Sequence, residues 1–224
     1  RNSVGIQIAG NDPFIMAEAA EIISKYNYNE ININVGCPSL RVQNCKVGAT
    51  LMKDPSLVAN CVQTMGETVD LPLSIKTRIG VDDKDNYRFL YDFVAETSNA
   101  GCRNFVIHAR KAFLNGLNPK QNRTIPPIDY EKVYRLKDDF KNLNITVNGE
   151  IISIEQIEQH LLHLDGVMIG RKAYKDPLFL LEIQQHFFTT KADSNRPLSQ
   201  FHIIKEMIDY AKNQITNGIN LHLM

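Results

Sequence analysis

A cysteine in a Gly-Cys-Pro turn is the first candidate for chemistry in this chain. Cys37 follows Asn34-Val35-Gly36, at the end of a short apolar run, and precedes Pro38-Ser39. A free thiol has an ordinary pKa of about 8.5 and is mostly protonated at neutral pH, so it can donate a proton as a general acid. The alternative is a small apolar residue that fills the core, as most free cysteines do. The place of Cys37 in a turn after a strand favours the proton donor.

Two basic side chains end apolar runs further along the chain. Lys76 stands in Ile75-Lys76-Thr77-Arg78, and His108 stands in Ile107-His108-Ala109-Arg110. A lysine buried at a strand end needs an anionic partner, because burial of an unpaired charge costs free energy. A flavin or a phosphate would serve, and so would a neighbouring carboxylate. A lone histidine is more often a hydrogen-bonded core residue, but the strand end and the following arginine favour a functional His108.

Two pairs that contain glycine, Asn148-Gly149 and Gly170-Arg171, follow the last two apolar runs. Glycine lets backbone N–H groups approach a phosphate closely. The loops after the last two strands of a β/α barrel are a common phosphate site. The two pairs in this order therefore predict a phosphate site.

The elements that must position these residues are short apolar runs that alternate with helical patterns. The runs read as nearly continuous, which is typical of parallel strands covered on at least one face. Helix starts are marked by Asp12-Pro13, Asp54-Pro55 and Asp176-Pro177, where Asp can cap the helix and Pro can occupy its first position. Ser153 with Gln156 predicts a capping box. The six predicted strands cover residues 4–9, 31–35, 73–77, 104–108, 145–148 and 166–169.

Alternating strands and helices predict an α/β fold with a parallel sheet. The pattern alone allows a doubly wound sheet or a TIM (β/α)8 barrel. Unusual polar residues follow nearly every strand, and a barrel gathers such residues at one mouth, whereas a doubly wound sheet concentrates chemistry at one switch point. We therefore predict a TIM (β/α)8 barrel that lacks its first two strands in this chain.

The pattern changes after Asp176, because only helical signals follow. Residues 191–197 are polar and end in Pro, which predicts a linker. We expect an N-terminally incomplete barrel domain over residues 1–190 and the start of a small helical domain over residues 191–224. The chain begins at Arg1 with no signal-like stretch, so we expect a fragment of a longer protein.

Composition limits the function further. The 224 residues hold 25 Lys and Arg against 25 Asp and Glu, so the formal net charge is zero and no strongly basic domain is present. No apolar run approaches the roughly 18 residues of a membrane helix. The cysteines lack zinc-finger and C-x-x-C spacing, so we expect neither a metal site nor a disulfide framework. Free thiols suit a reducing compartment, and we expect a cytoplasmic monomer with organellar targeting left open.

A local basic face is compatible with zero net charge. Residues 97–128 contain no Asp or Glu, and a second basic cluster consists of Arg171, Lys172 and Lys175. A basic rim around a barrel mouth would suit a polyanionic substrate. The alternative is a solvated basic surface that acids elsewhere in the chain balance. The basic residues of the first stretch are Arg103, His108, Arg110, Lys111, Lys120 and Arg123.

Taken together, these segments resemble the tRNA-dihydrouridine synthases, specifically the DusA-like branch. The resemblance runs in order from Val4 to about Pro177, and its specific blocks are Asn-Val-Gly-Cys-Pro-Ser and His-Ala-Arg-Lys-Ala. The other matches are Gln7-Ile8-Ala9-Gly10, Leu51-Met52, Ile75-Lys76-Thr77-Arg78-Ile79-Gly80, Asn118-Pro119-Lys120-Gln121-Asn122-Arg123, Ile125-Pro126-Pro127 and Gly166-Val167-Met168-Ile169-Gly170-Arg171.

The resemblance implies an FMN-dependent reductase whose flavin NADPH reduces. A hydride from the flavin would reach C6 of a uracil in the tRNA D-loop, and Cys37, which matches the catalytic cysteine of the family, would protonate C5. The positions that match FMN contacts are Gln7, Lys76, His108, Asn148, Gly149, Gly170 and Arg171.

The resemblance also implies tRNA contacts. Asn34 matches a position that contacts the target nucleotide, which must leave its stack to reach a flavin in a barrel mouth. The chain departs from the family pattern at Glu150, where a second glycine is usual, and at Phe113, where Trp is common. The remaining expected tRNA contacts are Arg110, Lys111, Lys120, Asn122 and Arg123.

Three other functions stay open at this point. A flavin-dependent barrel of the dihydroorotate or dihydropyrimidine dehydrogenase type would share the phosphate site and Lys76, but not the need for a basic stretch. A tRNA-binding protein that has lost its flavin would not need Cys37, Lys76 and His108 together. A barrel isomerase for a phosphorylated sugar has no use for the Cys-Pro turn.

Overall fold

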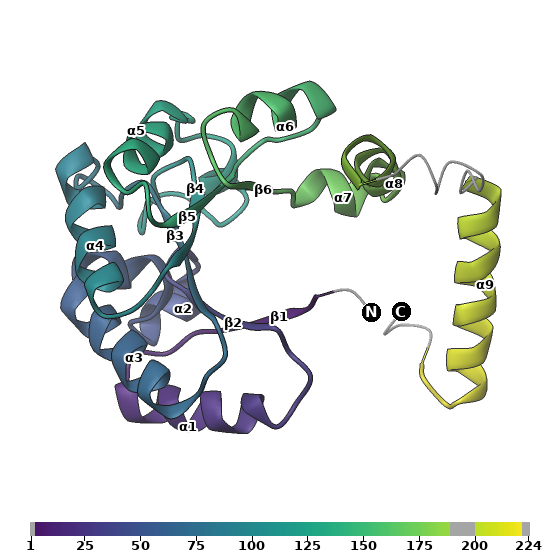
Figure 1. Cartoon of the computed structure of the whole chain (residues 1–224), viewed down its shortest axis with the longest axis horizontal. Coiled ribbons are helices and arrows are strands. Elements are labelled where there is room, and N and C mark those ends of the chain that lie inside the picture. The colour runs from purple at the N-terminus through teal and green to yellow at the C-terminus, as the bar shows by residue number, and fades with distance from the viewer. Residues whose placement is uncertain (1–2, 189–199, 221–224) are drawn as a thin grey trace. The chain divides into compact units, whose positions relative to one another are not determined.

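A computed structural model describes residues 3–188 and 200–220 of the chain (Figure 1). These residues fall into two compact units, Arg1–Gly170 and Arg171–Met224. All six predicted strands are present in the first unit, each within two residues of its expected bounds. The strands are β1 (Gly5–Ile8), β2 (Glu30–Asn34), β3 (Leu73–Arg78), β4 (Asn104–His108), β5 (Asn144–Asn148) and β6 (Gly166–Met168).

The strands form one parallel sheet in the order β1-β2-β3-β4-β5-β6. A doubly wound sheet reverses its strand order at a switch point, whereas the wall of a barrel keeps sequence order. The α/β fold with a parallel sheet is confirmed, and the strand order favours the barrel over the doubly wound alternative. Closure by two further strands stays a prediction.

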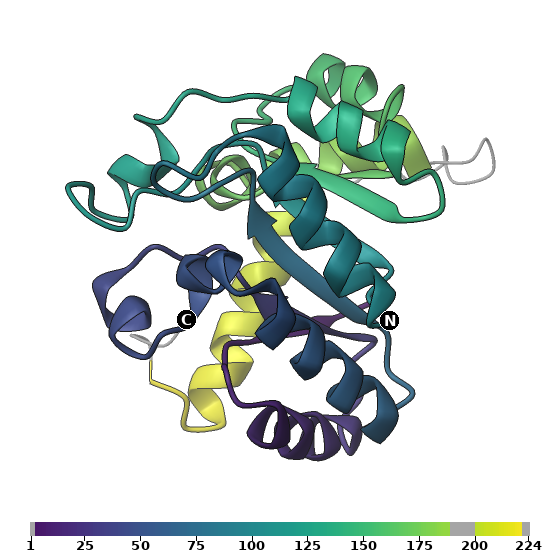
Figure 2. The same cartoon turned by 90° about the vertical axis from the view of Figure 1, so that its left-hand side faces the viewer.

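Helices line one side of this sheet. In Figure 1 the helices α1, α3, α4, α5 and α6 lie around the outer side of the curved strands, and Figure 2 looks onto this layer with α3 (blue) and α4 (blue-teal) in front of the strands. The first unit also has 3₁₀ turns at η1 (Gly48–Lys53) and η2 (Gln121–Arg123). Its helices are α1 (Pro13–Ser24), α2 (Leu40–Asn44), α3 (Pro55–Thr68), α4 (Tyr87–Asn99), α5 (Glu131–Asp139) and α6 (Ile154–Leu161).

The predicted helix starts depend on capping, and two Asp-Pro pairs behave as expected. Asp12 Oδ1 accepts hydrogen bonds from the N–H groups of Phe14 and Ile15 at 2.9 and 3.1 Å, and Asp54 caps α3 in the same way. Ser153 Oγ accepts from the Gln156 N–H at 3.3 Å. These bonds satisfy N–H groups that the first helical turn leaves without partners, which is why the helices begin there.

The second unit contains α7 (Arg171–Lys175), α8 (Leu178–Ile183), the π-helical turn η3 (Gln184–Phe188) and α9 (Gln200–Thr216). Its only described elements are therefore helices, in agreement with the helical signals of the sequence. α8 begins at Leu178, one residue later than the Asp176-Pro177 pair predicts. The predicted linker at 191–197 and the predicted boundary at 190–191 lie outside the described residues.

The strands alternate in polarity, which corrects the prediction of nearly continuous apolar runs. In β2, for example, Ile31 and Ile33 are at most 1% exposed under the helices, and Asn32 and Asn34 point to the opposite face. The cross-strand register continues this polar face over the neighbouring strands. The residues that share it include Gln7, Asn32, Asn34, Ser74, Lys76, Arg78, His108 and Asn148. The fold thus collects the polar strand residues on one side.

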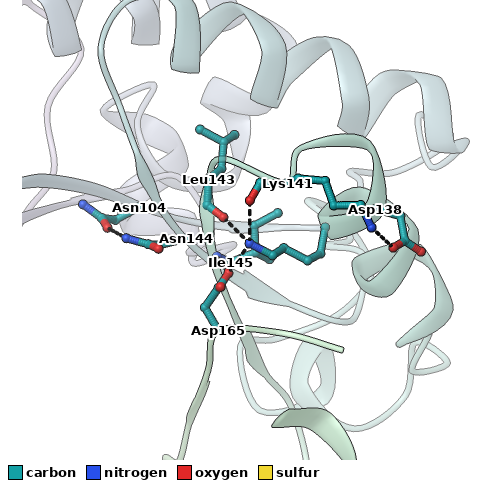
Figure 3. Close-up of polar contacts among 8 residues, drawn as sticks. Asn104, Asp138, Lys141, Leu143, Asn144, Ile145 and Asp165 are labelled. Atoms are coloured by element: carbon teal, nitrogen blue, oxygen red, sulfur yellow. Dashed lines mark hydrogen bonds and ion pairs between the residues drawn. The ribbon is translucent and has the colours of Figure 1, made fainter. Parts of the chain in front are cut away.

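Polar contacts also join the elements at the N-terminal edge of β5, the edge opposite the site residues (Figure 3). Lys137 Nζ lies 2.8 Å from Asp165 Oδ2 and donates to the Leu143 carbonyl at 2.8 Å. Asp165 Oδ2 also accepts from the Ile145 N–H at 2.8 Å, and the Asn144 side chain donates to Asn104 Oδ1 at 2.8 Å. Such contacts on this edge serve stability rather than chemistry.

The Asp165 carboxylate gives a testable contribution to stability. Partial burial alone would raise its pKa, but hydrogen bonds from Lys137 and the Ile145 N–H hold the pKa of Asp165 below its ordinary value. A lowered carboxyl pKa stabilises the fold above the unfolded pKa, near 4, and the stability is lost as the pH falls through the folded pKa. We expect Asp165→Asn to lower the free energy of unfolding by about 1 kcal/mol at pH 7, because water screens part of this exposed group.

Urea unfolding at pH 7 and pH 3 measures this effect. The difference between Asp165→Asn and the wild type should shrink at pH 3. Asp138→Asn is the control, because Asp138 forms a fully exposed pair with Lys141 at 2.8 Å and should leave stability nearly unchanged. An equal loss in both variants would contradict the assignment.

Candidate active site

The Cys37 turn is shaped by the last residue of β2. Asn34 Oδ1 accepts hydrogen bonds from the N–H groups of Gly36 and Cys37 at 3.1 and 3.0 Å. This is an Asx turn, in which a side-chain amide replaces a backbone acceptor. The turn leaves Cys37 partly exposed, with its sulfur 3.4 Å from Ser39 Oγ. The structure therefore presents the predicted proton donor at a strand end.

A glycine that the sequence analysis did not single out also holds this turn. Gly48 has φ +70°, and a Cβ atom there would collide with the Cys37 carbonyl oxygen and with Val42. The same carbonyl accepts a hydrogen bond from the Ala49 N–H at 2.9 Å. Any side chain at position 48 would thus push on the backbone of Cys37. The sequence signal for Gly48 was its position three residues before the Leu51-Met52 match.

The other cysteines lie in different environments. Burial raises the pKa of Cys61 to about 11, with a further contribution from Asp12, and raises the pKa of Cys102 to about 12. Both thiols are buried and stay protonated at neutral pH, which suits a structural role. Cys45 is exposed at the end of α2. All four are free thiols.

A ladder of amide and hydroxyl groups crosses the polar face beside the turn. Gln7 Nε2 donates to Asn32 Oδ1 at 2.6 Å, and Asn32 Nδ2 donates to Ser74 Oγ at 2.7 Å. Asn34 Nδ2 donates to Gln7 Oε1 at 2.9 Å. Both ends of the Asn34 amide are therefore engaged within the protein, and its predicted contact with the target nucleotide stays a prediction.

Lys76 lies on the same face, opposite Asn34 in the register of β2 and β3. Its Nζ donates to Asn148 Oδ1 at 3.3 Å, and Asn148 Nδ2 donates to the Met168 carbonyl at 2.8 Å. Desolvation and the positive charge of Arg78 lower the pKa of Lys76 to about 8, and Cys37 opposes this shift. No carboxylate in the described part of the chain forms an ion pair with Lys76, so the neighbouring-carboxylate alternative fails there.

A half-buried ammonium bonded to a neutral amide fits an anionic or electron-rich ligand.

The lowered pKa of Lys76 also leads to a prediction about stability. The pKa of Lys76 is about 8 in the folded protein and about 10.4 in the unfolded chain. Below pH 8 the buried lysine is fully charged, and the desolvation of this charge lowers the stability of the fold. Between pH 8 and 10.4 the unfolded chain binds the proton and the folded protein does not, so stability rises with pH. We expect Lys76→Met to raise the free energy of unfolding of the flavin-free protein by about 2 kcal/mol at pH 7.

Urea unfolding at pH 7 and pH 10 checks this, and the gain should shrink at pH 10. Lys25→Met is the matched control, because Lys25 is an exposed helical lysine near Glu21 and should leave stability within about 0.5 kcal/mol. A Lys76→Met variant that unfolds more easily at pH 7 would show that the ammonium is well compensated within the protein.

The ends of β4 and β5 meet at His108 and Gly149. His108 is 7% exposed and pairs with Asn148 in the register of the two strands. Gly149 has φ +135°, and a Cβ atom there would lie 3.2 Å from His108 Cδ2 and 3.1 Å from Ile128 Cδ1. Only glycine fits this backbone conformation and this close approach.

Glu150, where the chain departs from the family pattern, forms an ion pair. Glu150 Oε2 lies 2.7 Å from Arg110 Nη2, and Arg110 Nη1 also donates to the Pro126 carbonyl. The Arg110 side chain is 6% exposed, so it is engaged inside the protein. Arg110 therefore holds Glu150, and its predicted contact with tRNA stays a prediction.

Arg78 connects the Cys37 turn with the basic stretch. Its Nε donates to the Gly36 carbonyl at 3.0 Å, and its Nη1 donates to the carbonyls of Lys111 and Asn122 at 3.2 and 2.8 Å. Desolvation lowers the pKa of Arg78 to about 10, with Cys37 opposing the shift and Arg123 and Arg110 adding to it, so the buried guanidinium stays charged at pH 7. The sequence marked Arg78 only as a strand-end residue, because its three acceptors lie 33 to 44 residues away in the chain.

Some residues of the basic stretch are paired or buried in the fold. Lys111 Nζ lies 2.7 Å from Asp85 Oδ2, and this hydrogen bond holds the pKa of Asp85 below its ordinary value. Asn122 is fully buried, and its amide bonds to the backbone of Phe113 at 2.7 and 2.9 Å. Asn122 therefore supports its loop, and its predicted contact with tRNA stays a prediction. Lys120 and Arg123 are exposed, as a tRNA contact requires.

The remaining predicted residues lie at the boundary between the units. Gly170 ends the first unit and Arg171 begins the second. Their phosphate contacts stay a prediction. Among the described residues, no group of three or more His, Cys, Asp or Glu side chains could hold a metal ion. The described helices include none with the length and apolar character needed to cross a membrane.

Comparison with known proteins matches this arrangement to one family. The sequence model of the dihydrouridine synthase (Dus) family matches residues 1–224. Curated relatives named tRNA-dihydrouridine(20/20a) synthase are 48% identical in Vibrio vulnificus over 97% of this chain and 49% identical in Vibrio parahaemolyticus over 97%. The relative from Pasteurella multocida is 47% identical over 99% of this chain.

This chain spans 66%, 66% and 67% of the lengths of these three relatives. The family match extends over the whole chain, including the Cys37 turn, Lys76 and His108. The chain belongs to the dihydrouridine synthase family, in the DusA-like branch that its motifs resemble.

Proposed function

We propose that the full-length protein reduces uridine to 5,6-dihydrouridine in the D-loop of tRNA, with FMN as cofactor and NADPH as reductant. The names of the relatives indicate positions 20 and 20a as the targets. The observation that carries the proposal is the convergence of Cys37, Lys76 and His108 at the C-terminal ends of the adjacent strands β2, β3 and β4. Active sites of barrel enzymes are built at this edge.

The residues fit a flavin. Lys76 is a half-buried cation whose described partner is a neutral amide, and Gly149 keeps the end of β5 free of a side chain. Lys76, His108 and Asn148 would face the flavin, Gly149 would approach its phosphate through the backbone, and Gln7 would lie at the edge of the same face. Gly170 and Arg171 would complete the phosphate site. Reduced FMN bound there would supply the hydride that the uracil accepts at C6.

Cys37 would supply the proton. Its thiol would donate to C5 of the uracil, so that a hydride and a proton add across the C5–C6 double bond and the thiolate recovers its proton from solvent. The Asn34 bonds, Gly48 and the Arg78 bond to the Gly36 carbonyl keep the turn in place. Positioning of this kind removes the entropy of bringing donor and acceptor together.

Exposed cations would hold the tRNA. Lys120 and Arg123 would contact backbone phosphates, and Lys111 would do so from its pair with Asp85. Phosphate contacts of this kind set orientation rather than sequence preference. The helical domain that we predict from residue 191 onward would also contact tRNA. The tRNA affinity should therefore fall as the salt concentration rises.

A visible absorption spectrum of the full-length protein tests the proposal. We expect flavin bands that bleach with NADPH under anaerobic conditions and return when unmodified tRNA is added, with dihydrouridine formed in equal amount. Reoxidation by free uracil instead of tRNA would identify a small-molecule reductase. A protein that binds tRNA but neither holds nor takes up FMN would be a non-catalytic tRNA-binding protein.

A further inference from the structure

A turn of two residues with positive φ follows β5. Gly149 has φ +135° and Glu150 has φ +49°. Glu150 is one of three non-glycine residues with positive φ in the described chain, beside Lys46 and Asp82. A side chain in this region is strained, and the strain persists only where surrounding contacts hold it.

Contacts from two other segments hold this turn. Tyr130, at the start of α5, donates from its hydroxyl to the Gly149 carbonyl at 2.6 Å. Arg110, after β4, pairs with the Glu150 carboxylate at 2.7 Å. Separate contacts therefore hold the backbone of Gly149 and the side chain of Glu150.

We propose that Tyr130 is a positioning residue that holds the turn of Gly149 and Glu150 in the conformation that binds the phosphate group of FMN. The inference rests on the proposed function, since it takes the flavin phosphate to lie at this turn. In a planar trans peptide the carbonyl and the next N–H point in opposite directions. The bond from Tyr130 to the Gly149 carbonyl therefore also sets the direction of the Glu150 N–H. Backbone N–H groups in turns are phosphate ligands.

Tyr130 is itself held in place. The His160 ring packs edge-on against the Tyr130 ring, with centroids 4.5 Å apart. Burial and the nearby Glu150 carboxylate raise the pKa of Tyr130, and Arg110 opposes them, so the phenol remains a donor. Burial and His163 lower the pKa of His160, which keeps this ring neutral at pH 7. The support is therefore stable across the neutral pH range.

Flavin binding to Tyr130→Phe tests the inference. This change removes the hydroxyl and keeps the ring against His160. With flavin-free full-length protein, the Kd values of FMN and of riboflavin, which lacks the phosphate, are measured by quenching of flavin fluorescence. We expect the FMN Kd to rise about tenfold and the riboflavin Kd to stay within about twofold. The preference for FMN over riboflavin then falls about tenfold.

Tyr134→Phe is the matched control, because it removes a hydroxyl from the same helix that bonds to His160 and not to Gly149. It should leave the preference for FMN unchanged. Thermal unfolding of the flavin-free variants shows that both are folded at the assay temperature.

Three results would overturn the inference. If Tyr130→Phe weakens FMN and riboflavin equally, Tyr130 has only a structural role. If Tyr130→Phe leaves the preference unchanged, the hydroxyl does not position the phosphate site. If the wild-type protein binds neither flavin, the proposed function fails together with the inference, and this outcome differs from the first two because it does not involve the variant.

Discussion

Replacement of Cys37 by alanine is expected to abolish dihydrouridine formation while the protein still binds FMN, accepts electrons from NADPH and binds tRNA. The thiol is the group in the Asn34–Cys37 turn that can donate a proton to C5, and general acid catalysis contributes about 10²- to 10⁴-fold to a rate. Single-turnover reoxidation of the reduced flavin by unmodified tRNA measures the loss. The flavin spectrum and the tRNA affinity, measured on the same sample, separate a chemical defect from a binding defect.

Cys45→Ala is the matched control, because Cys45 is an exposed thiol outside the turn. It should leave the rate within about twofold. Cys37→Ser keeps a smaller and much weaker acid at the same position and should stay close to Cys37→Ala. A Cys37→Ala protein that forms dihydrouridine within a few fold of the wild-type rate would show that the proton comes from another group or from water.

Replacement of Arg78 by methionine is expected to produce the largest loss of stability. The buried guanidinium donates to the carbonyls of Gly36, Lys111 and Asn122, and methionine would leave these acceptors without their donors. Loss of a buried hydrogen-bonded charge of this kind costs about 3 to 5 kcal/mol. Urea unfolding of the flavin-free protein measures the change. The Cys37 turn should loosen as well, because the bond to the Gly36 carbonyl is lost.

Arg78→Lys should be intermediate, since an ammonium keeps the charge but cannot reproduce the fork of donors. Arg88→Met is the control, because Arg88 is 77% exposed and pairs with Asp92 one turn away on α4. It should change the free energy of unfolding by less than about 0.5 kcal/mol. An Arg78→Met protein as stable as the wild type would show that water or other donors satisfy the three carbonyls.

Local features of the sequence predicted the elements and the turn that carries Cys37. Asp12 and Asp54 cap helices because a side-chain oxygen satisfies N–H groups two or three residues ahead, a rule that needs only neighbouring residues. The Cys37 turn depends in the same way on Asn34, three residues earlier. The face carried by each strand was also present locally, in the alternation of Glu30-Ile31-Asn32-Ile33-Asn34, which we interpreted as a continuous apolar run.

The tertiary structure alone decided which charges are paired. Arg110 and Lys111 stand in a stretch without acids, yet Glu150 and Asp85 reach them from 40 and 26 residues away. The tertiary structure also buried Asn122 inside its loop. Partners at such separations are set by the register of the parallel strands and by the loops that return from helices to strands. Sequence determined where each chemical group stands on its element, and only the packing of the elements determined which groups remain exposed.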